Sequence, residues 1–133
     1  MTDWTGRTAT EIAAAVRTGE TTAGQVVAGH LDRIAKLNGE LGAFIRVRAA
    51  EAASEAKAVG QRADLAELPL AGVPVAVKDA VPVAGEPMRA GSAALPDAPQ
   101  AEDHRLQRQL KALVGGFEAE GLIEPDGVGT ALV

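Results

Sequence analysis

The most informative stretch of the sequence is Leu70-Ala71-Gly72-Val73-Pro74-Val75-Ala76-Val77-Lys78-Asp79. Every residue between Val73 and Val77 is apolar, so this segment has no polar face to offer to water. Such a pattern is typical of a strand in the middle of a sheet that helices cover on both faces. We therefore expect a buried strand at 73–77 that leads directly into Lys78.

Two amphipathic helices are expected before this stretch. Thr8 and Thr22 each begin a capping box, in which a threonine is followed three residues later by Glu or Gln. The apolar residues that follow each threonine recur at helical spacing. The pattern predicts a short helix that ends at Gly19 and a longer one that ends at Asn38-Gly39.

The remaining elements alternate between strand and helix. We expect a short strand at 44–47, an alanine-rich helix at 49–61, a Pro- and Gly-rich loop at 79–101 and a helix at 102–113. The last of these helices places three leucines on one side: Leu106, Leu110 and Leu113. This order of elements predicts an α/β protein.

Composition excludes several classes of function. The chain has 133 residues and a net charge of −5, with no basic block, so nucleic acid is not an expected partner. No apolar run reaches the length of a membrane span, and the first residues lack the layout of a secretory signal. There is no cysteine. We expect a cytoplasmic protein, and nine arginines against four lysines suggest a GC-rich bacterial gene.

Other residues that could carry chemistry have simpler explanations. His30 and His104 lie far apart and neither has a partner at the spacing of a metal site. Glu102 and Asp103 open a helix, where carboxylates favour the helix dipole, so we expect both to cap it. Gly115-Gly116 does not form a phosphate-binding loop, because no Lys-Ser or Lys-Thr follows. We therefore expect no metal and no cofactor.

The stretch from Leu70 to Asp79 resembles the segment that carries the catalytic lysine in amidase-signature enzymes. Further pieces occur in the order of that family, and the resemblance covers residues 8 to 113. These pieces are Thr10 to Ala13 with Gly19 to Thr21, Val26 to Asn38, Ala43-Phe44, the loop residues Gly85, Pro87, Gly91 and Ser92, and Asp103 to Leu110. The resemblance implies the amino-terminal part of the amidase-signature fold, in truncated form. That part is a helical pair followed by the first strands of a mixed sheet that helices flank.

The resemblance also implies a reaction. Enzymes of this family hydrolyse the carbon–nitrogen bond of small amides with a Ser–Ser–Lys triad. A neutral lysine draws a proton through a bridging serine, and a second serine attacks the carbonyl. Lys78 occupies the position of this lysine, and burial at the end of an apolar strand would favour its neutral form. Asp79 either orients Lys78 or begins the turn that follows.

The chain differs from the family because it lacks the serines of the triad. It contains two serines, Ser54 and Ser92, and neither lies in the glycine- and serine-rich stretch that supplies the triad. Ser54 is expected to be a solvated helix residue and Ser92 a turn residue. Because a base without a hydroxyl partner cannot attack a carbonyl, we expect this polypeptide to be inactive on its own.

The resemblance ends near residue 113. We therefore divide the chain into an amidase part, residues 1–113, and a divergent tail, residues 114–133, that is either frameshifted or disordered. Two other hypotheses stay open. The amino-terminal helices could form a non-catalytic module that binds an amidase chain or a second copy of this chain, or a separate chain could donate the serines.

Overall fold

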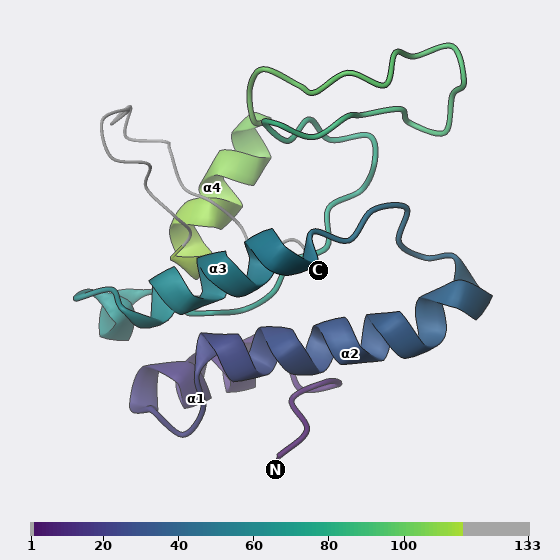
Figure 1. Cartoon of the computed structure of the whole chain (residues 1–133). Coiled ribbons are helices and arrows are strands. Elements are labelled where there is room, and N and C mark those ends of the chain that lie inside the picture. Colours follow the sequence, from purple (N-terminus) through teal and green to yellow (C-terminus); the bar gives the residue numbers. More distant parts are fainter. Residues whose placement is uncertain (1, 116–133) are drawn as a thin grey trace.

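The structure is a computed structural model, and it describes residues 2–115. Figure 1 shows the helices and the long loops that connect them. The elements are α1 (Ala9–Thr18), α2 (Ala23–Leu41), α3 (Ala49–Gly60), the 3-10 helix η1 (Leu65–Glu67) and α4 (Arg105–Val114). The part of the predicted tail from residue 116 onward lies outside the described residues, whereas Val114 and Gly115 complete α4. None of the helices in the described part is long and apolar enough to cross a membrane.

Both predicted capping boxes are confirmed. The Thr8 hydroxyl accepts the Glu11 N–H at 3.2 Å, and the Glu11 carboxylate accepts the Thr8 N–H at 2.8 Å. Thr22 and Gln25 form the same reciprocal pair at the start of α2. These bonds satisfy donors that a helix start leaves without intrahelical partners.

The end of α2 lies beyond the predicted stop at Asn38-Gly39. The helix continues to Leu41, and Gly42 ends it with a left-handed φ of 58°. Asn38 has another role, because its side chain bonds both backbone groups of one residue. Its amide donates to the Phe44 carbonyl at 2.8 Å, and its oxygen accepts the Phe44 N–H at 2.7 Å. Asn38 thus fixes the chain that leaves α2.

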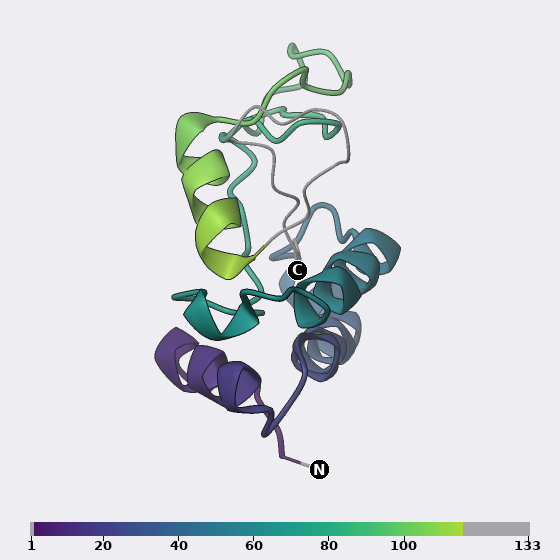
Figure 2. The same ribbon diagram turned by 90° about the vertical axis from the view of Figure 1, so that its left-hand side faces the viewer.

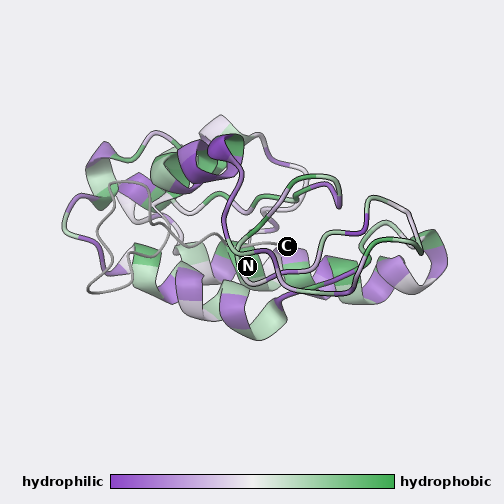
Figure 3. Ribbon diagram, turned by 90° about the horizontal axis from the view of Figure 1, so that it is seen from above, coloured by the Kyte–Doolittle hydropathy of each residue, from purple (hydrophilic) through white to green (hydrophobic). Residues whose placement is uncertain are grey.

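The hydrophobic core lies between α1, α2, α3 and the segment 68–73. Figures 1 and 2 show these helices grouped at one end of the molecule, with α4 and the loop before it at the other. Alternating hydrophobic and hydrophilic bands run along the helix ribbons (Figure 3), as amphipathic helices require. Helix α3 packs against α2, and its buried residues are Ala52, Ala56 and Val59. The buried residues of α1 and of the first part of α2 include Ile12, Val16, Val26 and Val27, which the helical periodicity placed on one face, and Val114 of α4 joins the same core.

The predicted strands at 44–47 and 73–77 are not present as strands in the described residues. Two isolated bridges join residues of this part of the chain, Ala84 with Gln100 and Pro87 with Pro99, and Val75 also lies at a bridge position. Val73 is buried, but Ala76 is exposed. An apolar strand needs neighbouring strands on each side and a layer on each face. Residues 2–115 do not supply these neighbours for the 73–77 segment.

Helix α4 begins later than predicted. It begins at Arg105, after His104, whose ring accepts the Leu106 N–H at 3.2 Å. Leu106 is 59% exposed and Leu113 is 39% exposed, while Gln107 and Lys111 are buried. Two of the three leucines of this helix, Leu106 and Leu113, are therefore exposed, and polar side chains take buried positions instead.

An ion pair holds α4 in this orientation. The Lys111 ammonium lies 2.5 Å from the Asp103 carboxylate, and both side chains are only 10% exposed. Asp103 also accepts the Ala84 N–H at 2.8 Å. The prediction that Asp103 caps the helix is wrong, because its carboxylate is engaged with Lys111 and with the loop.

Candidate functional site

Hydrogen bonds from α1 and α4 hold the backbone of the segment that leads to Lys78. The Arg17 guanidinium of α1 donates to the carbonyls of Leu68 and Pro69 at 3.0 and 2.9 Å. The Leu70 N–H donates to the Leu113 carbonyl at 3.0 Å, and the Gly72 N–H donates to the Val114 carbonyl at 3.2 Å. These last two bonds satisfy carbonyls at the end of α4 that have no partner within the helix.

Gly72 is required at its position by space and by backbone conformation. Its φ of +66° is strained for any residue with a side chain. A Cβ atom there would lie 2.7 Å from the Cβ of Ala23, the first residue of α2. Gly72 therefore lets the lysine-bearing segment pass directly against the start of α2.

Lys78 and Asp79 lie in a turn beyond this anchored segment. The Val81 N–H donates to the Lys78 carbonyl at 3.0 Å. The Asp79 carboxylate accepts the Arg89 N–H at 3.1 Å, and the Asp79 carbonyl accepts the Ala90 N–H at 2.8 Å. Of the two roles considered for Asp79, these bonds correspond to the turn. The Lys78 side chain is exposed, so the burial expected from the sequence is not present in this structure.

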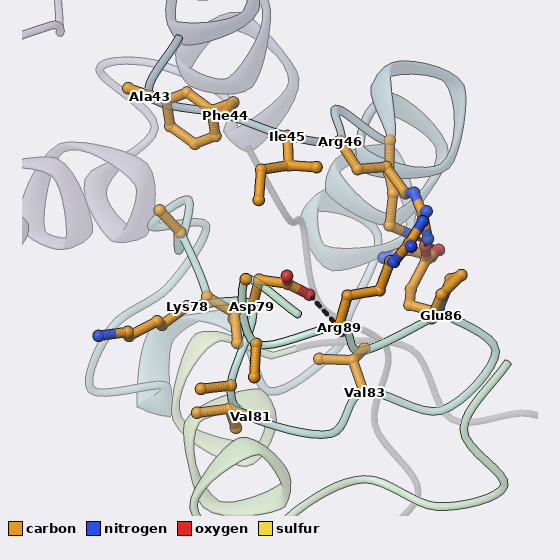
Figure 4. A pocket seen from close by; sticks show the side chains of 17 residues that line it. Ala43, Phe44, Ile45, Arg46, Lys78, Asp79, Val81, Val83, Glu86 and Arg89 are labelled. Atoms are coloured by element: carbon orange, nitrogen blue, oxygen red, sulfur yellow. Dashed lines mark hydrogen bonds and ion pairs between the residues drawn. The ribbon is translucent and has the colours of Figure 1, made fainter. Parts of the chain in front are cut away.

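A pocket of about 610 Å³ lies beside this turn. Its walls come from the connection between α2 and α3, from the Lys78 turn and from the loop up to Gly91. Figure 4 shows the Lys78 amine on one side of the view and the guanidinium groups on the other. Apolar side chains line the pocket as well, among them Ile45, Val81 and Val83. A second, smaller pocket of about 280 Å³ lies along the outer part of α2.

Arginines and glutamates form a cluster at the side of the larger pocket opposite the Lys78 amine. Arg46 and Arg48 both pair with Glu86, at 3.1 and 2.8 Å. Arg48 also pairs with Glu55 of α3 at 3.1 Å. Burial raises the pKa of Glu55, although the Arg48 charge opposes this shift. Sequence reading missed this cluster, because its members are distant in sequence and no motif joins them.

The other residues considered from the sequence do not contribute to this pocket. Ser54 is exposed on α3, and Ser92 accepts the Ala94 N–H at 3.2 Å, as a turn residue does. Neither serine lines the pocket. His30 bonds the Val26 carbonyl within its own helix at 2.8 Å. Within residues 2–115, no three acidic, His or Cys side chains gather in a way that could hold a metal ion.

Comparison with known proteins shows to which protein family the chain belongs. A sequence model of the family described as Amidase matches residues 25–115, a range that includes Lys78 and the whole lining of the pocket. The chain belongs to the amidase family. The resemblance stated from the sequence is confirmed, and so is its assignment to the amino-terminal part of these proteins.

Two amidase relatives belong to glutamyl-tRNA(Gln) amidotransferases, in which each is the A subunit. The relative from Salinispora tropica is 41% identical over 114 residues, which cover 84% of this chain and 23% of the relative. The relative from Nocardia farcinica is 37% identical over 115 residues, which cover 84% of this chain and 24% of the relative. This amidase chain thus spans about a quarter of the length of the curated relatives it matches.

A solved structure shares the fold. It is an inhibitor-bound form of a vestigial protein complex that reveals the evolutionary origins of an s-triazine catabolic enzyme. The similarity has a TM-score of 0.67 at 33% identity, and it covers 78% of this chain and 24% of the other. The fold of the described residues is therefore that of the amino-terminal part of an amidase.

Proposed function

We propose that this chain supplies the lysine-bearing part of an amidase-family enzyme that hydrolyses carbon–nitrogen amide bonds, with Lys78 as the base. The observation that carries the proposal is the position of Lys78. It lies within the range that the family model matches, and it lines the pocket of about 610 Å³. The substrate would be a small amide.

The proposed reaction needs two serines beside the lysine. A neutral Lys78 amine accepts a proton through a bridging serine, and the second serine, once deprotonated, forms a bond to the amide carbon. The carbon–nitrogen bond then breaks, the leaving nitrogen takes up the proton, and water hydrolyses the resulting acyl-serine ester to release the acid and restore the serine. The exposure of Lys78 in this structure is consistent with a base that has no serine partner beside it.

These 133 residues alone are therefore expected to be inactive. An ammonia-release assay with small primary amides tests this expectation on the purified chain. We expect no release above the buffer rate, because neither Ser54 nor Ser92 lines the pocket. Turnover that the Lys78→Ala variant abolishes would show that the chain is a complete enzyme.

A chimera tests the role of Lys78 itself. Residues 25–115 replace the corresponding segment of the Salinispora tropica relative, with which this chain shares 41% identity over 114 residues. We expect the chimera to release ammonia from amides and its Lys78→Ala version to lose at least about 100-fold in rate, because a positioned base contributes about that much. Lys57→Ala on the exposed face of α3 is the matched control. Equal rates for both variants would exclude Lys78 as the base.

A second candidate function is association with an amidase chain or with a second copy of this chain. α1 and the first part of α2 bury their apolar residues in the core of this chain, so they offer little surface for a partner. The far end of α2 differs, because Leu37 and Leu41 are 40% and 67% exposed. Light scattering with size exclusion tests this candidate. A monomer mass for the chain alone and in the presence of an intact amidase would exclude it.

A further inference from the structure

The pocket beside Lys78 carries more positive than negative charge. Four of its lining residues are cationic and two are acidic, whereas the whole chain has a net charge of −5. The acidic residues are Asp79, which bonds the loop backbone, and Glu86, which pairs with two arginines. The pocket is therefore a cationic region in an acidic protein.

Arg89 is the arginine of the pocket lining that takes no part in the ion pairs with Glu86. Arg46 pairs through one oxygen of Glu86 and Arg48 through the other, so both oxygens of that carboxylate are engaged. Figure 4 shows the Arg89 side chain directed toward the same cluster. Among residues 2–115, its guanidinium makes no hydrogen bond and no ion pair.

The backbone of Arg89 is fixed although its guanidinium has no partner. Its N–H donates to the Asp79 carboxylate, and its carbonyl accepts the Ser92 N–H at 2.8 Å. The next residue, Ala90, has a left-handed φ of 49°, which an alanine adopts only where its surroundings require it. A side chain that starts from a fixed backbone loses less freedom when it binds a ligand.

We propose that Arg89 determines substrate specificity by binding a carboxylate group of the amide substrate. The inference rests on the proposed function, because it assigns the ligand of the same pocket. A guanidinium presents parallel N–H donors that match the two oxygens of a carboxylate. The apolar side chains of Ile45, Val81 and Val83 also line this pocket, so they suit a short aliphatic spacer between the amide and the carboxylate.

A pair of probes that differ only in charge tests the proposal. Succinamate carries one amide and one carboxylate, and succinamide of the same length carries two neutral amides. Binding of each to the full 133-residue chain is measured by NMR titration. We expect succinamate to bind at least about tenfold more tightly, since a hydrogen bond to a charged group contributes about that factor. Equal affinities, or binding of neither probe, would overturn the proposal.

Variants assign the preference to Arg89. Arg89→Gln should abolish the preference for succinamate, and Arg89→Lys should keep part of it, because the charge stays and the paired donors are lost. Arg105→Gln at the exposed start of α4 makes the same charge change outside the pocket and should leave the preference intact. Retention of the full preference in Arg89→Gln would contradict the assignment.

Two arrangements keep the result interpretable. The contrast between the probes in the unaltered chain decides the proposal even if Arg89→Gln does not fold. Inorganic phosphate is titrated as a third probe, and binding as tight as that of succinamate would identify a general anion site and overturn the assignment to substrate. These titrations measure binding and no turnover. A negative result here would therefore exclude the role of Arg89, whereas only the chimera assay could exclude Lys78 as the base.

Discussion

The segments before and after Val73 differ in how they bury their apolar residues. Thirteen of the fifteen buried hydrophobic residues in the described part lie at or before Val73, and only Val83 and Val114 lie after it. In α4 the positions turned inward include Gln107 and Lys111, while two leucines are exposed. The first segment thus satisfies its hydrophobic pattern within residues 2–115, and the second does not. Hydrophobic periodicity predicts which residues can be buried, but burial also needs a partner surface.

The largest effect is expected where the two segments meet. Gly72→Ala should lower the free energy of unfolding by about 3 kcal/mol, since it combines a left-handed backbone with a clash against Ala23. Gly85→Ala is the matched control, because its φ is +80° but its Cβ would meet nothing within 4 Å. It should cost only about 1 kcal/mol. Urea unfolding followed by circular dichroism measures both, and equal losses would show that Gly72 and Ala23 are not in close contact.

The second-largest effect is expected from loss of the ion pair between Lys111 and Asp103, which holds α4. Lys111→Met removes the partner of a mostly buried Asp103 carboxylate, which should cost about 2 kcal/mol, below the range for fully buried pairs. Lys57→Met on the exposed face of α3 should change stability by less than about 0.5 kcal/mol. Hydrogen exchange should show faster exchange in α4 of the Lys111→Met variant. Unchanged protection there would mean that the ion pair does not hold the helix.

Truncation of matched apolar residues compares the two segments directly. Val27 is 1% exposed, and Val27→Ala should destabilise the chain by about 1.5 kcal/mol. Leu106 is 59% exposed, and Leu106→Ala should cost less than about 0.5 kcal/mol although it removes a larger side chain. Thermal unfolding measures both variants. A larger loss for Leu106→Ala would show that its face of α4 is covered in solution.

The smallest effect concerns pH. Burial raises the pKa of Glu55 above its ordinary value of 4.5, so the folded state holds this proton more tightly than the unfolded state. The stability that the group contributes is present below pH 4.5 and is lost as the pH rises through the folded-state pKa. Relative to Glu55→Gln, the unaltered chain should therefore become less stable between about pH 4 and pH 7. An increase over this range would show that the attraction of Arg48 outweighs burial.

The sequence predicted the elements whose signals are local. Capping boxes at Thr8 and Thr22 fixed the starts of two helices, because the bonds join residues three apart. The end of α2 was predicted too early, since Asn38 bonds Phe44 instead of ending the helix. This difference depends on the path of the chain after the helix, which no local pattern describes.

Long-range features were predicted less well. Lys78 was predicted from the motif around it, whereas the cluster of Arg48, Glu55 and Glu86 joins three separate segments and has no spacing signal. No sequence pattern indicated the orientation of α4 either, because it depends on the contacts of Asp103 with Lys111 and with the loop at Ala84. Pairing across long sequence separations therefore determines the parts of the site that the sequence alone did not predict.

The bonds between Asn38 and Phe44 also affect the chemical lifetime of the chain. Asparagine followed by glycine is the dipeptide most prone to deamidation, in which the next backbone nitrogen attacks the side-chain carbon to form a cyclic imide. Here the Asn38 side chain is held by Phe44, and the helix keeps the Gly39 nitrogen away from it. Folding thus protects the Asn38 side chain from deamidation. The rate of deamidation at Asn38 would therefore report how often the end of α2 unfolds.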